Sequence, residues 1–392
     1  MADPSVPHLS LAQSDPVARW VNELLSHAHQ NRASDIHLEP LPNELKVRLR
    51  IDGHLMAYAS PSVNWRDRII SKFKVMSRMD IAEKRLPQDG RLQWTSGSVS
   101  MGLRASSLPT LHGEKLVLRL LPNEQQPRTM NSLGYDPKQV EHVQQALSSP
   151  HGLILVTGPT GSGKSATLMA CLQSLDQHSL NITTVEDPVE QVILGINQIG
   201  INEKIGLDFP TTLRALLRQD PDVLLVGEIR DLPTAMVAAQ AAQTGHLVLS
   251  TLHTNSASSA VLRLRHMGVP ADHLAACLRL VCAQRLVRLL CPHCKTLQTQ
   301  GHWIAVGCPK CHGGFWGRQA VHEVIPITTS LIQLILVNAA AQTLEQAARK
   351  EGFKSMSDAA DTLVQQGLTT KAEVLQAVQG EVNALSDTAS SA

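Results

Sequence analysis

Apolar and polar positions change their pattern near residue 133. Before that point, "LKVRLRI" alternates apolar and basic residues, which is typical of a strand exposed on one face, and "VARWVNELLSHAHQ" is a helical stretch. After it, nearly continuous apolar runs such as "GLILVT" and "DVLLV" are separated by helical patterns. Strands buried on both faces and joined by helices predict a parallel α/β sheet. We therefore expect a small α+β domain followed by an α/β core.

The pattern divides the chain into five segments. These are an α+β domain (16–122), a linker (123–132), a P-loop core (133–290), a tetracysteine subdomain (291–311) and a helical C-terminal region (312–385). The polar stretch "PNEQQPRTMNS", which holds two prolines, predicts a hinge between the first two domains. The last residues, "GEVNALSDTASSA", are expected to be frayed.

Composition narrows the class of protein. The chain has 392 residues, of which 43% are hydrophobic and 18% charged, as in a folded protein with sizeable cores. A net charge of +1 and only 3% aromatic residues do not favour a nucleic-acid partner. Basic residues in "VLRLRHMG" and "CAQRLVRLL" are therefore expected at a subunit interface or on a salt-bridged helix face.

Nothing in the chain has the pattern of a membrane span or a secretory leader. No run approaches the roughly 20 apolar residues that a spanning helix needs, and the first residues, "MADPSVPHLS", contain an acid and prolines. We expect a cytoplasmic protein that associates with the inner membrane only through partners.

A phosphate-binding motif stands between an apolar strand and a helix. The stretch "GPTGSGKS" satisfies G-x-x-x-x-G-K-[ST], and its members are Gly158, Pro159, Thr160, Gly161, Ser162, Gly163, Lys164 and Ser165. In such a loop backbone amides cradle the phosphates, the lysine reaches the β and γ phosphates, and the Ser165 hydroxyl ligates Mg²⁺. The sequence therefore predicts binding of ATP with Mg²⁺. The alternative is a glycine-rich turn with a chance lysine.

Acidic and histidine residues follow other apolar strands. Glu228 ends "DVLLVGE" and is expected to hold Mg²⁺ directly or through water, the alternative being a surface acid paired with Arg230. Glu186, in "TVEDPVE", is then free to orient the attacking water. In "GHLVLSTLH", His253 stands at the end and His246 at the start, and each is either a sensor of the γ-phosphate or a packed side chain.

Four cysteines form two pairs with the spacing C-x₂-C-x₁₃-C-x₂-C, namely Cys291, Cys294, Cys308 and Cys311. Four thiolates suit tetrahedral Zn²⁺ in a structural site, while a redox-active or vacant site is the alternative. His293 and His312 are adjacent to the pairs and are not expected to be ligands. The other three cysteines are expected to be buried in helical, apolar surroundings: Cys171, Cys277 and Cys282.

Several motifs in fixed order resemble one family. They are "ASDIHLEP", "RLRIDG", "DIAEKRLPQDGRL", "GPTGSGKS", "TVEDPVE", "LRALLRQDPDVLLVGEIRD", "TGHLVLSTLHTNSA" and "AQRLVRLLC". Together they are similar to the secretion and pilus-assembly ATPases of type II secretion and type IV pili, the GspE/PilB family, over about residues 20–380. The resemblance implies a RecA-like P-loop core preceded by a PAS-like nucleotide-sensing domain.

The resemblance also implies roles for individual residues. Glu186 would activate water in an Asp box, Glu228 would belong to an atypical Walker B segment, and the stretch from His246 to His253 would be a His box. Arg104 and Arg119 match arginines of the first domain that reach the nucleotide. Such proteins work as homo-hexamers that dock on an inner-membrane platform and drive the insertion of pilin-like subunits.

Some positions depart from the family. Pro233 stands where the family usually carries glutamate, and Gln191 where it carries an aromatic residue. Proline is accommodated in the first turn of a helix, but the loss of an acid near Glu228 could weaken turnover. The short cysteine spacer is similar to that of the HofB-like branch. The sequence begins close to the nucleotide-sensing domain, which puts in doubt the coupling that many relatives achieve through additional N-terminal domains.

Two other functions stay open beside the assembly ATPase. One is a weakly hydrolysing or non-hydrolysing scaffold that binds nucleotide to regulate the same machinery. The other is a retraction-type or nucleic-acid translocating motor on the same core, although retraction motors typically lack a four-cysteine site.

Overall fold

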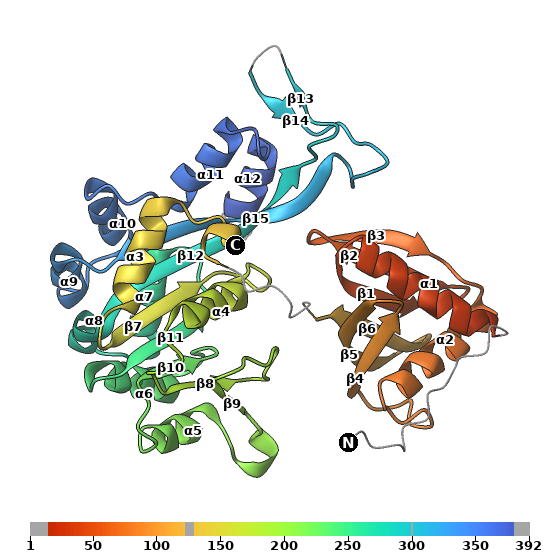
Figure 1. Cartoon of the computed structure of the whole chain (residues 1–392), viewed down its shortest axis with the longest axis horizontal. Helices are drawn as coiled ribbons and strands as arrows, with labels where there is room; N and C mark the ends of the chain where they lie inside the picture. The colour runs from red at the N-terminus through yellow and green to blue at the C-terminus, as the bar shows by residue number, and fades with distance from the viewer. Residues whose placement is uncertain (1–14, 122–128, 299–300, 380–392) are drawn as a thin grey trace, which may run out of the picture. The chain divides into compact units, whose positions relative to one another are not determined.

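The computed structural model describes residues 15–121, 129–298 and 301–379. The chain folds into two compact units, Met1–Gln125 and Gln126–Ala392 (Figure 1). This division falls inside the linker predicted at 123–132, of which residues 123–128 lie outside the described residues. The expected frayed end and the first ten residues also lie outside them. The domain limits drawn from the sequence stay predictions.

The first unit is a six-stranded sheet with two helices. The strand order is β3-β2-β1-β6-β5-β4, and all neighbouring strands are antiparallel. Its elements are α1 (Pro16–Gln30), β1 (Ala33–Pro40), β2 (Leu45–Ile51), β3 (His54–Ala59), α2 (Val63–Met76), β4 (Gln88–Ser96), β5 (Val99–Thr110) and β6 (Gly113–Leu120). Burial alternates strictly along β2, as its sequence predicts, and α1, α2 and the sheet share one apolar core.

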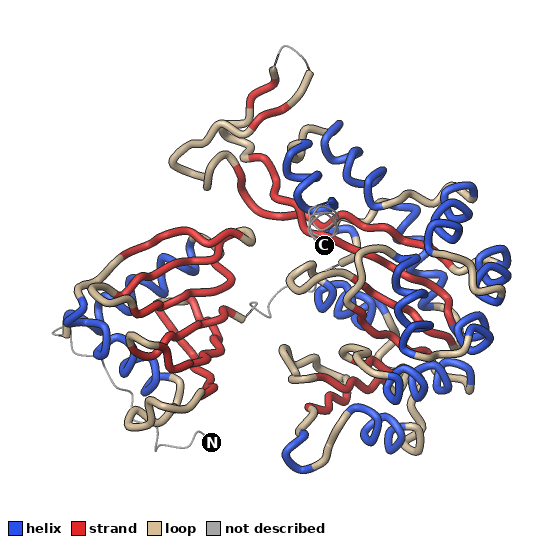
Figure 2. Tube along the Cα trace, turned by 180° about the vertical axis from the view of Figure 1, so that it is seen from behind, coloured by secondary structure: helices blue, strands red, loops and turns tan. Residues whose placement is uncertain are grey.

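The second unit is built on a seven-stranded sheet of order β15-β12-β7-β11-β10-β8-β9. All neighbours are parallel except β12 and β15. Its strands are β7 (Gly152–Thr157), β8 (Ile182–Glu186), β9 (Asn197–Gly200), β10 (Val223–Val226), β11 (Leu247–Leu252), β12 (Leu278–Leu290) and β15 (Phe315–Pro326). Two apolar clusters of buried residues pack against this sheet, and helices lie on both of its sides (Figure 2). This is the α/β architecture that the apolar runs predict.

The helices of the second unit lie before, between and after its strands, and four of them follow the last strand. They are α3 (Pro137–Leu147), α4 (Lys164–Ser174), α5 (Phe209–Leu216), α6 (Leu232–Gln243), α7 (Ala257–Met267), α8 (Ala271–Cys277), α9 (Thr329–Leu336), α10 (Ala341–Lys350), α11 (Met356–Gln365) and α12 (Lys371–Gln379). Two 3₁₀ turns (Asn131–Leu133 and Glu203–Ile205) and a short hairpin, β13 (Thr296–Leu297) with β14 (Trp303–Ile304), complete it. Within the described ranges, no helix has the length and apolar character needed to cross a membrane.

Two segments differ from expectation. The stretch "CAQRLVRLL" forms strand β12 and no helix face, and Cys282 lies on this strand. Strand β12 lies between β7 and β15, and periodicity alone does not separate such a buried strand from a buried helix. The C-terminal region, expected to be helical, begins with β15 before its four helices.

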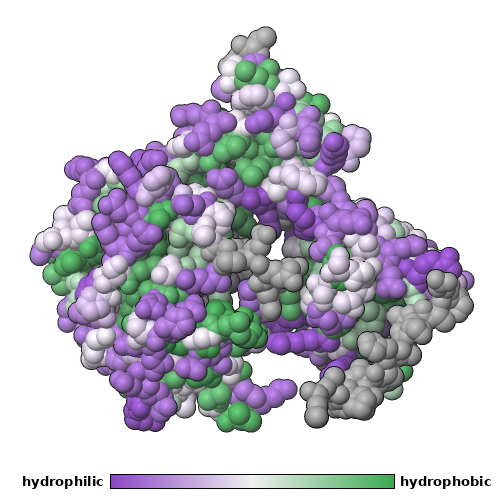
Figure 3. Space-filling model, in the orientation of Figure 1, coloured by the Kyte–Doolittle hydropathy of each residue, from purple (hydrophilic) through white to green (hydrophobic). Residues whose placement is uncertain are grey.

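Figure 3 shows the surface of each unit in the orientation of Figure 1. The residues on this face are mostly hydrophilic, with smaller apolar areas between them.

Candidate functional site

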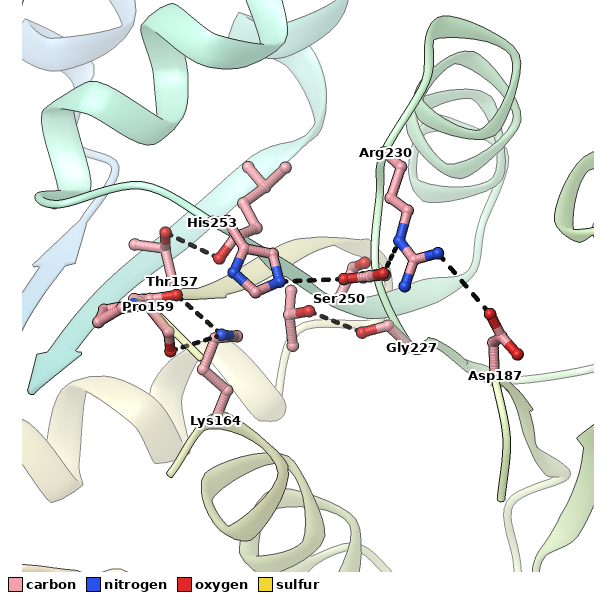
Figure 4. A network of polar contacts seen from close by, with 12 residues as sticks. Thr157, Pro159, Lys164, Asp187, Gly227, Arg230, Ser250 and His253 are labelled. Atoms are coloured by element: carbon pink, nitrogen blue, oxygen red, sulfur yellow. Dashed lines mark hydrogen bonds and ion pairs between the residues drawn. The ribbon is translucent and has the colours of Figure 1, made fainter. Parts of the chain in front are cut away.

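Four strand ends of the second unit meet at one edge of its sheet. Strands β7, β11, β10 and β8 are parallel neighbours in that order, so their carboxyl ends lie side by side. Lys164 follows β7 through the P-loop, His253 follows β11, Glu228 follows β10, and Glu186 is the last residue of β8. The edge at which parallel strands end is where α/β proteins bind ligands. The structure thus places four residues that are far apart in the sequence at one edge of the sheet. Figure 4 shows two of them, Lys164 and His253.

The P-loop wraps tightly around the start of α4. Gly163 caps this helix with φ 93°, a left-handed conformation that favours glycine. A Cβ at Gly158, where φ is +151°, would lie 2.5 Å from the carbonyl oxygen of Gln284, so a side chain does not fit there. Lys164 Nζ donates to the carbonyl oxygens of Gly158 (2.8 Å) and Pro159 (3.1 Å), and burial lowers the pKa of this lysine to about 8. The loop and its lysine have the form of an anion cradle.

Glu228 is the centre of a charged cluster, whose other members His253, Arg230 and Asp187 are labelled in Figure 4. Its Oε2 lies 3.1 Å from His253 Nε2, its Oε1 forms an ion pair with the Arg230 Nε, and Arg230 Nη1 lies 3.7 Å from Asp187 Oδ2. The pairing with Arg230 left open by the sequence is therefore present, and the same carboxylate also contacts the histidine. Burial, together with the positive charges of Lys164 and Arg230, lowers the pKa of His253. A neutral imidazole donates to Glu228 only from Nε2–H.

Glu186 is buried and held by two donors. Its Oε1 accepts hydrogen bonds from Thr184 Oγ1 (2.7 Å) and from Gln198 Nε2 (3.0 Å). Gln198, on β9, also donates to the Gln191 carbonyl oxygen (2.9 Å), and its Oε1 accepts from the backbone amide of Ile193 (2.7 Å). Sequence reasoning missed both donors. Two-residue spacing places Thr184 on the same strand face as Glu186, whereas no local signal marks Gln198.

His246 lies at the other end of β11 from His253. The six-residue strand separates them by roughly 20 Å. The His246 Nδ1 lies 3.0 Å from the Ala241 carbonyl oxygen, at the amino-terminal edge of the sheet. Within the second unit, the structure does not bring His246 together with the other predicted site residues.

The two arginines of the first unit are neighbours in its sheet. Arg104 on β5 lies opposite Arg119 on β6, and Arg119 lies opposite Asp35 on β1. Arg119 Nε donates to Asp35 Oδ1 at 3.0 Å, and the Asp35 side chain is buried. A buried carboxylate thus holds the guanidinium group of Arg119, and Arg104 lies opposite Arg119 on the neighbouring strand.

A cavity of about 620 Å³ borders the P-loop. It is lined by Pro159, Thr160, His253, Thr254, Asn255, Ser259, Leu262, Arg263 and His266. The lining joins the P-loop and the segment after β11 to one side of α7, and it contains no acidic residue. Space and positive charge for an anionic ligand are therefore present beside Lys164.

Pro233 is accommodated at the start of α6, as expected. The helix begins with Asp231 as N-cap, whose side chain accepts a hydrogen bond from the Thr234 amide at 2.8 Å, and the proline lies in the first turn. A proline there removes an amide that has no partner within the helix. Pro233 is therefore compatible with the first turn of α6.

The four paired cysteines converge as predicted. Their sulfur atoms all lie within 4.8 Å of one another, with distances of 4.0 Å for Cys291–Cys308, 3.7 Å for Cys294–Cys311 and 3.6 Å for Cys308–Cys311. Zn–S bonds of about 2.3 Å in a regular tetrahedron place sulfurs about 3.8 Å apart. The four thiols therefore fit Zn²⁺, and neither His293 nor His312 belongs to the group.

Comparison with known proteins identifies the family. Residues 10–376 match the family model described as type II/IV secretion system protein. The chain belongs to this family. It is 46% identical over 362 residues to the type II secretion system protein HxcR of Pseudomonas aeruginosa, covering 92% of this chain and 77% of that protein. It is equally identical over 374 residues to the protein transport protein HofB homolog of Escherichia coli, covering 92% and 81%.

Other members of the family carry names that state an activity. The type IV pilus assembly ATPase PilB of Pseudomonas aeruginosa is 44% identical over 394 residues, covering 95% of this chain and 70% of that protein. Among solved structures, the pilus retraction motor PilT with bound ADP is similar with a TM-score of 0.65 and 29% identity, covering 91% of this chain and 96% of that one. The family and fold expected from the motifs are confirmed.

Proposed function

We propose that this secretion-family chain binds ATP with Mg²⁺ and hydrolyses it. The observation that carries the proposal is the meeting of Lys164, Glu228, His253 and Glu186 at one edge of the parallel sheet. Phosphoryl transfer requires positioned charges and an oriented nucleophile more than covalent chemistry. The site meets that requirement: the P-loop with Lys164 can bind the phosphates, Glu228 can hold the metal, and Glu186 can orient the water.

Each residue has a distinct role in the proposal. The hydroxyl of Ser165 and the carboxylate of Glu228 are oxygen donors, which Mg²⁺ prefers, and they hold the ion. Mg²⁺ neutralises charge on the phosphates when it is bound. Glu186 orients the attacking water, and His253 orients Glu228 through the contact at 3.1 Å. Arg104 and Arg119 bring positive charge to the phosphates, and Zn²⁺ held by the four cysteines serves structure alone.

The relatives suggest what the hydrolysis drives. Proteins named for type II secretion, protein transport and pilus assembly are 44–46% identical to this chain. We propose that the chain acts in the cytoplasm as a homo-hexamer on an inner-membrane platform protein, where it powers the assembly of pilin-like subunits or protein export. The similar pilus retraction motor PilT binds ADP, which is compatible with this proposal.

A phosphate-release assay on the full chain tests the proposal. Wild type should turn over ATP in the presence of Mg²⁺, while Glu186→Gln and Glu228→Gln should lose at least about a hundredfold in kcat. Glu190→Gln is the matched control, because Glu190 follows Glu186 in the same acidic stretch but is exposed. Wild-type turnover no faster than that of the two site variants would refute the motor and favour the nucleotide-dependent scaffold.

A further inference from the structure

One buried side chain amide links strand β12 to the P-loop. Gln284 is 1% exposed, and its Nε2 donates to the carbonyl oxygen of Ser162 at 2.8 Å. Its Oε1 accepts a hydrogen bond from Thr167 Oγ1, also at 2.8 Å. Both ends of the amide are therefore engaged with the loop and with the helix α4 that follows it. A buried polar group satisfied in this way is held in one orientation.

Strand register places the amide at the loop. Ala283 on β12 lies opposite Thr157, the last residue of β7, so the next residue along β12 lies beside the start of the loop. A Cβ built on Gly163 would lie 3.1 Å from Gln284 Nε2, so the amide packs directly against the turn that precedes Lys164. The contact is close enough to control the conformation of this turn.

Thr167 determines which end of the amide faces the loop. Its hydroxyl donates to Gln284 Oε1, which leaves the NH₂ group for the Ser162 carbonyl. The Tyr135 hydroxyl is the next polar group, at 3.5 Å from Thr167 Oγ1 and 3.2 Å from Cys282 Sγ, so the contact of Thr167 with Gln284 at 2.8 Å is the shorter one. If the amide were reversed, Gln284 Oε1 would face the carbonyl oxygen of Ser162, and both are hydrogen-bond acceptors.

The consequence concerns the backbone amide of Gly163. In a trans peptide the C=O and N–H groups point in opposite directions. A Ser162 carbonyl held toward Gln284 therefore turns the Gly163 N–H away from β12. Backbone N–H groups of such a loop bind the phosphates of a nucleotide. A flip of this one peptide would replace a donor in the cradle by a carbonyl oxygen, which repels phosphate.

We propose that Gln284 is a positioning residue that holds the Gly163 amide ready to bind a phosphate of the nucleotide. The inference rests on the proposed binding of ATP by the P-loop, and it adds that a residue distant in sequence sets the affinity of the loop. Without the Gln284 amide, the affinity of the loop for nucleotide should fall. A nucleotide that does bind should still reach Glu186 and Glu228, so the rate of hydrolysis in the complex should change little.

Calorimetric binding of Mg·ADP and steady-state kinetics test the inference on the full chain. Gln284→Met keeps the length of the side chain but removes both hydrogen bonds, and it should raise the Kd for ADP and the KM for ATP about tenfold. The kcat should stay within about threefold of wild type. Gln240→Met, on the exposed face of α6, is the matched control and should change neither constant.

A second pair of variants separates positioning from packing. Thr167→Val removes the hydroxyl that orients the amide and should raise Kd and KM as Gln284→Met does. Thr167→Ser keeps the hydroxyl, loses a methyl group, and should restore both constants to near wild type. This pair also serves if Gln284→Met does not fold, which its melting temperature would reveal.

The binding measurements separate the proposed binding of nucleotide by the P-loop from the proposed role of Gln284. Failure of wild type to bind Mg·ADP would overturn the proposed function itself. Wild-type binding with a Kd for Gln284→Met or Thr167→Val within about twofold would overturn only the role of Gln284. Equal losses in Thr167→Ser and Thr167→Val would overturn it too, because the hydroxyl would then not be responsible.

Discussion

The carboxyl group of Glu323 should make the stability of the second unit depend on pH. This residue of β15 is 2% exposed, and its Oε2 accepts a hydrogen bond at 2.8 Å from the amide of Ala257, the first residue of α7. Burial raises the pKa of Glu323 to about 7, and Glu345 adds to the rise, while the Ala257 amide, Arg349 and Arg285 oppose it. We predict that Glu323→Gln stabilises the protein above neutral pH.

The size of the effect follows from the shift in pKa. The ordinary pKa of this carboxyl is 4.5 and the folded value is about 7, a difference worth about 3 kcal/mol in free energy of unfolding. Below pH 4.5 the group is protonated in both states, so the stability that its raised pKa confers is fully present. That stability is lost as the pH rises through about 7, where the folded state must bury a charge. Glutamine never ionises and still accepts the Ala257 hydrogen bond.

Thermal melting of wild type and Glu323→Gln at a series of pH values measures the difference. The variant should melt at the wild-type temperature near pH 4.5 and roughly 6 °C or more higher near pH 8.5. Glu203→Gln, which changes an exposed acid, should show no such pH-dependent gain. A gain of the same size at every pH, or none near pH 8.5, would refute the assignment of a buried ionising group.

Two more predictions concern the site and the cysteine cluster. Gln198→Leu should lower kcat about tenfold with Mg·ADP binding intact, because Glu186 loses one of its two donors and with it a fixed orientation; a phosphate-release assay measures this, and an equal loss in Glu190→Gln would contradict it. Cys308→Ser should reduce the zinc content, measured by atomic absorption, and lower the melting temperature, because three thiolates leave the tetrahedron incomplete. Cys171→Ser is the control and should keep the full zinc content, since Cys171 lies in α4, outside the cluster. Equal zinc content in wild type, Cys308→Ser and Cys171→Ser would exclude the cluster as the metal site.

Much of the fold and part of the site could be read from the sequence alone. Apolar runs predicted the parallel strands, because a strand buried on both faces needs apolar residues at every position. The P-loop and the cysteine pairs are local motifs whose chemistry depends on short spacing. Glu186 and Glu228 follow two apolar stretches, and parallel strands place such ends at one edge of the sheet, so their common position is predictable although their roles stay proposals.

Only the tertiary structure decided which side chains meet across long separations in sequence. It paired Glu228 with both Arg230 and His253, placed His246 at the far end of its strand, and made "CAQRLVRLL" a strand. It also brought Gln198 to Glu186 and Gln284 to Ser162, contacts that no local pattern marks. The physical reason is that these contacts depend on strand order and register, which packing of the whole sheet determines, whereas motif and periodicity report only on neighbours in the chain.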